Sequence, residues 1–423
     1  MSSLATTFRS LRSPNYRIWA AGALVSNIGT WMQRTAQSWL VLTELTQGNA
    51  TAVGIVQALQ FGPQMLLLPW TGFAADHLDR RKLLIATQAA MGLLALGLGL
   101  LTVSGQVELW QVYGFALLFG CASAFDAPAR QTFVADLVGE ADLANAVALN
   151  STSFNAARMI GPAVAGVLIA SVGTGWAFIV NGASFGAVLI SLSFLRVSEL
   201  HAEARAGRMR GSLVAGFRYV WGRPDLRAIV ITLFLISTFG FNFAIFISTM
   251  AVNVFHADAG LYGVLNSVMA VGTIVGSLLA AGRDRPQFAH LFSGAAIFGL
   301  GCTMAALMPN VWLFGAALAV IGVSALTFSN TSNSLMQITT EPAMRGRVMA
   351  IRLAVALGCT PLGSPFVGWV ADHFGPRWSV GVAAASGILA ALVALRHLLK
   401  YETDGARRET RSVTSDEASR LRP

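Results

Sequence analysis

The chain has 423 residues, of which 55% are hydrophobic and 12% are charged, against about 25% charged residues in ordinary soluble domains. A soluble protein of this length needs more charge to cover its surface, so the composition excludes that class. The net charge of +9 does not indicate nucleic-acid binding, because the basic excess lies in short loops between apolar runs, where membrane topology explains it.

The apolar residues form twelve runs, each close to the roughly 20 residues that a helix needs to cross a bilayer. We expect an all-α integral membrane protein with transmembrane helices at residues 17–44, 51–76, 83–104, 108–129, 147–172, 175–195, 227–254, 259–282, 288–308, 311–335, 348–373 and 376–399. They divide into two six-helix bundles, residues 1–195 and 227–400. Residues 196–226 are predicted to be a cytoplasmic linker with an interfacial helix, and residues 401–423 a disordered cytoplasmic tail.

Basic residues lie almost entirely on one side of the predicted membrane. If the N-terminus is cytoplasmic, the opposite side holds only Arg377 among the loop arginines and lysines. This asymmetry follows the positive-inside rule and predicts a multi-pass protein of the cell inner membrane with both termini in the cytoplasm. Three arginines, Arg34, Arg158 and Arg352, fall inside predicted helices.

Two stretches nearly repeat each other, GFAADHLDRR at residues 72–81 and GWVADHFGPR at residues 368–377. They end the second and eleventh predicted helices and therefore face opposite sides of the membrane, which excludes a catalytic Asp-His pair built from both. A shift of 202 residues also places residues 165–178 on 367–380 with matched glycines. These likenesses predict inverted three-helix units that are then doubled.

The stretch GFAADHLDRRKLL at residues 72–84 lies in the predicted cytoplasmic connection between the second and third helices. Gly72 is expected where helices pack closely, and Asp76 can face the positive end of a neighbouring helix. The basic cluster that includes Arg80 and Arg81 can pair with acids on adjacent helices. On charge alone, a plain positive-inside loop with an incidental acid explains the stretch equally well.

The order Gly-x-x-x-Asp-x-x-x-Arg-Arg, with twelve helices in two halves, resembles the signature of the major facilitator superfamily. Within it, the chain looks like the enterobactin-exporter group of siderophore and drug exporters at residues 26–46, 54–81, 161–173, 216–228 and 345–351. The resemblance implies a cytoplasmic latch in which Asp76 faces the start of the eleventh helix and Arg80 pairs with Asp126 near the inner end of the fourth. The chain departs from the usual motif at Asp79, where glycine is common.

A Gly-Pro element, Gly161-Pro162-x-x-x-Gly166, lies in the fifth predicted helix. Proline inside a helix removes a hydrogen bond and bends it, and flanking glycines permit close packing. The resemblance associates a similar element with exporters rather than importers, although this copy lacks the full set of glycines. A kink with no bearing on direction is the alternative.

The resemblance places the substrate cavity between the first, fourth, seventh and tenth helices. Arg34 lies near the middle of the first, where a charge is costly unless it faces water or a partner. With Trp31, Gln33 and Gln37 it predicts a polar wall for an anionic or hydrogen-bonding substrate; snorkelling or structural pairing of Arg34 is the alternative. The other expected cavity residues, for which ordinary packing is the alternative, are Asn242, Phe243, Asn330 and Asn333.

Enzyme classes find no support, because the chain has no GxxxxGK[ST], HExxH or CxxC motif. We expect no cofactor and no metal site, and the three cysteines lie inside predicted helices as small apolar residues. No acid is placed at mid-membrane. Asp126 comes closest and is the open candidate for proton coupling, although its latch role is favoured. Drive by the membrane potential and protonation of the substrate itself are the alternatives for coupling.

The sequence therefore predicts a secondary active transporter, an antiporter that exports a small organic molecule such as a siderophore, drug or amphiphilic metabolite. It is expected to act as a monomer in contact with membrane lipid and without nucleic acid. A nutrient importer or a lysophospholipid flippase of the same fold is the alternative within this class. A non-transporting membrane sensor or scaffold is the alternative outside it.

Overall fold

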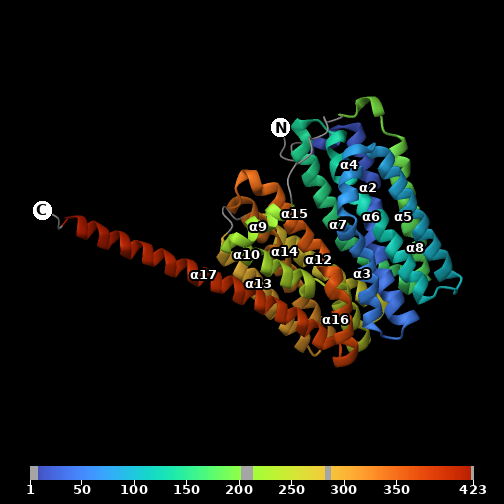
Figure 1. The fold of residues 1–423 in the computed structure, drawn as a ribbon. Helices are drawn as coiled ribbons and strands as arrows, with labels where there is room; N and C mark the ends of the chain where they lie inside the picture. Colours follow the sequence, from blue (N-terminus) through green and yellow to red (C-terminus); the bar gives the residue numbers. More distant parts are fainter. Residues whose placement is uncertain (1–7, 202–212, 282–286, 421–423) are drawn as a thin grey trace.

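The computed structural model describes residues 8–201, 213–281 and 287–420. The side chains of Pro69, Ala75, Asp76, Leu213, Ala280, Ala281, Leu357 and residues 400–420 lie outside that description. Over the described ranges the secondary structure is entirely helical. Figure 1 shows two helical bundles side by side, the first drawn in blue to green and the second in yellow to red.

The first bundle begins with a short turn and continues through long antiparallel helices. They are η1 (Arg9–Arg12), α2 (Pro14–Trp39) extended by η2 (Leu40–Leu45), α3 (Ala50–Leu66), α4 (Leu68–His77), α5 (Arg80–Val103), α6 (Leu109–Leu137), α7 (Glu140–Val172) and α8 (Thr174–Ser193), followed by the turn η3 (Val197–Glu199). Polar caps fix several starts, because a side-chain oxygen satisfies a free backbone N–H there. The Asp79 carboxylate accepts from the backbone N–H of Lys82 at 3.0 Å, so the acid that departs from the usual motif caps α5.

The second bundle follows the predicted linker, of which residues 202–212 lie outside the described chain. Its elements are α9 (Leu213–Gly222), α10 (Pro224–Leu235), η4 (Ile236–Gly240), α11 (Phe243–Thr249), η5 (Met250–Val254), α12 (Ala259–Ala281), α13 (Phe288–Leu307), α14 (Val311–Thr339), α15 (Pro342–Gly358), α16 (Thr360–Phe374) and α17 (Pro376–Arg420). The tail differs from the disorder expected from residue 401, since α17 continues as a helix that leaves the bundle (Figure 1).

Ten helical runs in the described chain are long and apolar enough to cross a membrane. Two more passages, α2 with η2 and α3 with α4, complete the twelve predicted helices. The first is too polar to count among the ten, because Asn, Gln and Arg side chains occupy part of α2. The second is interrupted after Leu66, just before Pro69, and α3 alone has 17 residues.

Within the described ranges, the strongest packing between the two bundles lies at one end. We call the end that carries the start of α2 and the α4–α5 connection the basic end, and the opposite end the far end. At the far end α3 packs on α16 and α7 packs on α12. The Asp372 carboxylate of α16 accepts from the backbone N–H groups of Ala50 at 2.7 Å and Thr51 at 2.8 Å, the first residues of α3. An acid on a helix N-terminus is favourable, so this contact ties the bundles together.

The α7–α12 contact depends on residues without side chains. A Cβ atom added to Gly263 of α12 would lie 2.6 Å from the carbonyl oxygen of Pro162 in α7. One added to Gly166 would lie 2.8 Å from the carbonyl oxygen of Ala259. Glycine at both positions therefore lets the two backbones approach.

This contact makes the replacement Gly263→Ala destabilising. The added methyl group overpacks the seam at a cost of about 1–3 kcal/mol, more than the gain in helix propensity of about 1 kcal/mol. Gly186→Ala in α8 is the matched control, because a Cβ there meets nothing within 4 Å. Thermal unfolding of the purified protein in detergent should show a lower midpoint for Gly263→Ala and an equal or higher one for Gly186→Ala. Equal midpoints for both variants would contradict the claim that the packing of α7 on α12 requires glycine at position 263.

Candidate functional site

A cavity of about 930 Å³ lies between the bundles. The α3–α16 and α7–α12 contacts, which together form the far-end seam, separate it from the far end. Its wall runs along α6 from Phe119 to Val134 and along α7 from Pro162 back to Val147, that is, from the middle of the molecule toward the basic end. The second bundle contributes the break around Asn242 and one side of α12. The cavity thus extends toward one end of the molecule while the other end is closed.

One stripe of α2 supplies much of the wall. Its residues follow helical spacing and are Asn27, Thr30, Trp31, Arg34, Thr35 and Ser38. Gln33 and Gln37 occupy a different stripe and are 3% and 2% exposed. The Gln33 side chain accepts from the Asn181 side-chain amide of α8 at 2.5 Å. The structure therefore corrects the expectation that these two glutamines line the cavity.

Arg34 faces the cavity and stacks on aromatic rings. Its guanidinium carbon lies 4.8 Å from the ring centre of Trp31 and 4.8 Å from that of Phe61. Arg158 of α7, for which the sequence predicts no role, lies 5.3 Å from the centre of the same Trp31 ring. Neither arginine forms an ion pair with a carboxylate of the described chain. The structural pairing considered for Arg34 is therefore not seen in this state.

The second bundle presents Asn242 and Phe243 to the cavity, at the break between η4 and α11. The Asn242 amide donates to the carbonyl oxygen of Thr238 at 2.8 Å, whereas its buried oxygen has no hydrogen-bond partner in the structure. Asn330 and Asn333 are absent from the wall because α14 packs against α12 and α13. Tyr262 and Asn266 of α12 line that side of the cavity. The expectation that the tenth helix contributes Asn330 and Asn333 to the wall was therefore wrong.

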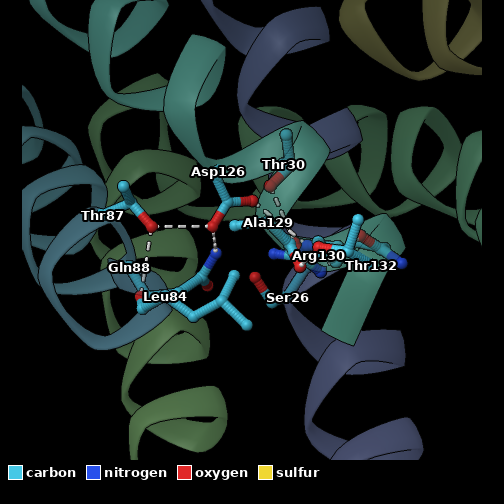
Figure 2. Close-up of polar contacts among 10 residues, drawn as sticks. Ser26, Thr30, Leu84, Thr87, Gln88, Asp126, Ala129, Arg130 and Thr132 are labelled. Carbon is cyan, nitrogen blue, oxygen red and sulfur yellow. Dashed lines mark hydrogen bonds and ion pairs between the residues drawn. The ribbon is translucent and has the colours of Figure 1, made fainter. Parts of the chain in front are cut away.

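Asp126 forms a buried polar cluster in the cavity wall (Figure 2). Its carboxylate is 3.1 Å from Nε of Arg130 and accepts from the Thr87 hydroxyl at 2.9 Å and the Gln88 amide at 2.6 Å. Arg130 also donates to the Asn27 side chain at 3.3 Å. Asp126 is 6% exposed and is the sole acid among the described residues that line the cavity.

Arg80 pairs with Asp136, at 2.6 Å, instead of with Asp126. The assigned partner was wrong because α6 continues to Leu137, well past the expected end of the fourth helix at residue 129. Ten residues of helix separate the two acids, about 15 Å along the axis, so Asp126 lies much deeper. Arg81 donates to the carbonyl oxygen of Leu192 at the end of α8, at 2.9 Å.

Of the other expected latch residues between α4 and α5, Gly72 is the one whose surroundings the structure describes. The side chain of Asp76 lies outside the described residues. A Cβ added to Gly72 would meet nothing within 4 Å, so Gly72 does not pack against another helix here as expected. The reason is the separation of the bundles at the basic end.

The Gly-Pro element of α7 contacts both bundles. A Cβ on Gly161 would lie 2.6 Å from Cβ of Trp31, so Gly161 lets α7 approach α2. Pro162 lies inside α7 and lines the cavity, and Gly166 lies in the seam with α12. The element therefore joins the cavity wall to the far-end seam.

Sequence reasoning missed Arg130, Arg158, Tyr262 and Asn266 as cavity residues. A signal existed for Arg158, since it is an arginine inside a predicted helix as Arg34 is. Arg130 could not be recognised in the same way, because the fourth helix was expected to end at residue 129 and an arginine in a loop is not unusual. In the described part of the chain, no three His, Cys, Asp or Glu side chains gather as metal ligands.

Solved structures of transporters share this fold. A bacterial homologue of the human lysosomal transporter Spinster, in an inward-facing and unoccupied conformation, superposes with a TM-score of 0.72 and 16% identity, covering 92% of this chain and 98% of that one. A POT family transporter in complex with 5-aminolevulinic acid gives a TM-score of 0.72 at 12% identity, covering 91% and 95% of the two chains. These similarities confirm the predicted all-α major facilitator fold.

Curated relatives extend over most of the chain. The staphyloferrin A transporter of Staphylococcus aureus is 26% identical over 371 residues, covering 86% of this chain and 92% of its own. The enterobactin exporter EntS of Escherichia coli K12 is 26% identical, with 82% and 84% covered. The multidrug efflux pump Tap of Mycolicibacterium fortuitum is 25% identical, with 84% and 88% covered.

The family model described as "Transmembrane secretion effector" matches residues 5–417, nearly the whole chain. The predicted resemblance to siderophore and drug exporters of the major facilitator superfamily is thereby confirmed. The chain belongs to the transmembrane secretion effector family of major facilitator transporters.

Proposed function

We propose that this protein exports a small organic molecule across the cell inner membrane by alternating access. The observation that carries the proposal is a central cavity closed at the far end and extending toward the basic end. The positive-inside rule puts the basic end in the cytoplasm, so this is the state in which an exporter takes up its substrate. The names of the relatives, which include an enterobactin exporter and a multidrug efflux pump, favour export over import or lipid flipping.

The two near-repeated stretches act as opposite latches in this cycle. Asp372, from the second copy, holds the start of the second passage, α3, at the far end. Asp76 occupies the same place in the first copy. Inverted symmetry pairs it with the start of the eleventh passage, α15, when the basic end closes. Each carboxylate would stabilise the closed form of its own end through the positive end of a helix.

Asp126 is the group we assign to proton coupling. Arg80 pairs with Asp136, so Asp126 is not part of the latch. Asp126 lies in the wall of the cavity beside Arg130. Protonation of the carboxylate would neutralise it and release the Arg130 guanidinium. The charge of the wall would then depend on whether Asp126 carries the proton, and this couples substrate binding to protonation.

Direction is tested with inverted membrane vesicles from cells that make the protein. A compound first identified by comparing the metabolites and drug sensitivity of cells with and without the protein should accumulate inside energised vesicles. Loss of preloaded compound from the vesicles would show import. Absence of any flux for every compound that distinguishes the cells would indicate a sensor or scaffold.

Asp372→Asn should weaken the far-end latch, because the charge that faces the N-terminus of α3 is lost. Ser364 of α16 is buried beside Gly54 of α3, and a cysteine introduced there by Ser364→Cys reports opening of the far end. With the native cysteines replaced by alanine, Asp372→Asn should increase labelling by an external maleimide several-fold.

Asp258→Asn is the matched control, since Asp258 caps α12 by accepting from the Leu261 N–H at 2.7 Å, within its own bundle. It should leave the labelling unchanged.

Asp76→Asn should reduce the maleimide labelling and cut transport sharply, while the protein still inserts normally. Asp79→Asn, which keeps a cap on α5, should change neither the labelling nor the transport. Unchanged labelling in Asp372→Asn would contradict the far-end latch. Unchanged transport in Asp76→Asn would contradict the basic-end latch.

Asp126→Asn should abolish transport driven by a pH gradient and leave exchange of labelled for unlabelled substrate intact, because an amide cannot take up the proton while the other residues of the binding site remain. Both are measured in proteoliposomes. Asp142→Asn is the control, since Asp142 is 41% exposed and pairs with Arg9 away from the cavity. Gradient-driven transport by Asp126→Asn at the wild-type rate would assign coupling to another group.

A further inference from the structure

The cavity has an unbalanced charge. Three arginines but a single acid line it among the described residues, and Arg130 is paired with that acid. Arg34 and Arg158 remain without an ion pair in the described chain. Every described lining residue from the second bundle is uncharged. The positive charge is therefore concentrated on α2 and α7 of the first bundle.

The two unpaired arginines share one aromatic platform. Both guanidinium groups lie within 5.3 Å of the Trp31 ring centre, and Arg34 also contacts Phe61. The ring of Phe154 packs edge-on against Trp31 at 5.7 Å, which fixes the platform. The Nε atom of Arg34 is buried and has no hydrogen-bond partner among the described residues. Stacking holds the arginines in place but leaves donors for another molecule.

The guanidinium carbons of Arg34 and Arg158 lie 4.8 and 5.3 Å from the same Trp31 ring centre and so are at most about 10 Å apart. Two like charges at such a separation inside a membrane protein raise the energy of the empty site. Water and aromatic faces offset this in part, whereas a bound anion removes the repulsion and can accept from both guanidinium groups. A cationic ligand would add a further like charge. The electrostatics therefore select an anion.

The remaining wall selects an apolar, ring-bearing body. Aromatic side chains enter the cavity from both bundles and include Phe61, Phe119, Phe154, Phe185, Phe241 and Phe243. At about 930 Å³ the space is near the upper end of small-molecule sites, large enough for more than one ring.

We propose that the transported molecules are organic oxyanions that carry an aromatic ring, and that Arg34 and Arg158 together bind the anionic group. The proposal rests on the transport function proposed above and names its substrate class. The aromatic part packs against the phenylalanines, and the second bundle supplies neutral hydrogen-bonding groups such as Asn242. Arg158 is thus a specificity-determining residue as much as Arg34 is.

Three fluorescent probes that share one aromatic group and differ in charge test the proposal. Dansylglycine is an anion at neutral pH, dansylglycinamide is its neutral counterpart, and dansylethylenediamine is a cation. Binding to the purified full-length protein in detergent is followed by dansyl fluorescence. The wild type should bind the anion at least about tenfold more tightly than the amide, and the cation most weakly.

Arg34→Gln and Arg158→Gln should each weaken dansylglycine binding by about five- to tenfold, and the double variant should lose the preference for the anion. Arg34→Lys and Arg158→Lys keep the charge and should keep the preference. Arg227→Gln is the matched control, because Arg227 is exposed at the start of α10 and does not line the cavity. Dansylglycinamide binding should stay constant in all variants, which also shows that they fold.

Equal or tighter binding of the neutral or cationic probe by the wild type would overturn the proposal, whatever the variants do. Unchanged dansylglycine binding in the double variant would also overturn it. The maleimide labelling of the Ser364→Cys protein is an independent readout of alternating access. A protein that prefers the neutral probe yet switches between labelled and protected states would remain a transporter with another substrate class. One that prefers the anion but never switches would bind without transporting.

Discussion

The carboxylate of Asp372 on the N-terminus of α3 holds the observed state. It joins the eleventh membrane passage to the second, so it acts between the bundles and not within one. In the separate contact between α7 and α12, glycines let the two backbones touch, whereas no described atom lies within 4 Å of a Cβ added to Gly72 at the basic end. The position of the cavity follows from this difference, because a closed far end leaves the space between the bundles continuous with the basic end.

The division of chemistry between the bundles follows the same logic. Charged cavity residues belong to the first bundle, and the second offers aromatic and amide groups across a gap. In the proposed cycle, movement of the second bundle away from a substrate bound to the arginines of the first has to break only weak contacts on the neutral side. The interruption of the seventh passage at Asn242 follows the π-helical segment η4 and is separated by the short helix α11 from a second one, η5. It adds a place where that wall can deform.

Much of this could be predicted from the sequence. Twelve apolar runs gave the fold class, and the inverted position of the two near-repeats correctly placed Asp76 and Asp372 at opposite ends. Arg34 and Trp31 were found because an arginine in an apolar run is conspicuous. The errors arose where a contact depends on rotation or length. Gln33 and Gln37 lie on a stripe of α2 next to the one that lines the cavity. Asn330 and Asn333 are on a helix behind α12. Asp126 was predicted to pair with Arg80 in place of Asp136, because the end of α6 was placed too early.

The sequence by itself determined the class of protein, since the burial of apolar runs in lipid and the satisfaction of every backbone group within helices leave few folds. It also determined the ends of those helices that carry proline or a capping residue. Only the tertiary structure decided which side chains meet. The partner of Arg80, the stacking of two arginines on Trp31 and the contact of Asp372 with α3 each join residues from different helices. Their distances depend on how helices rotate and slide against one another, which hydropathy does not encode.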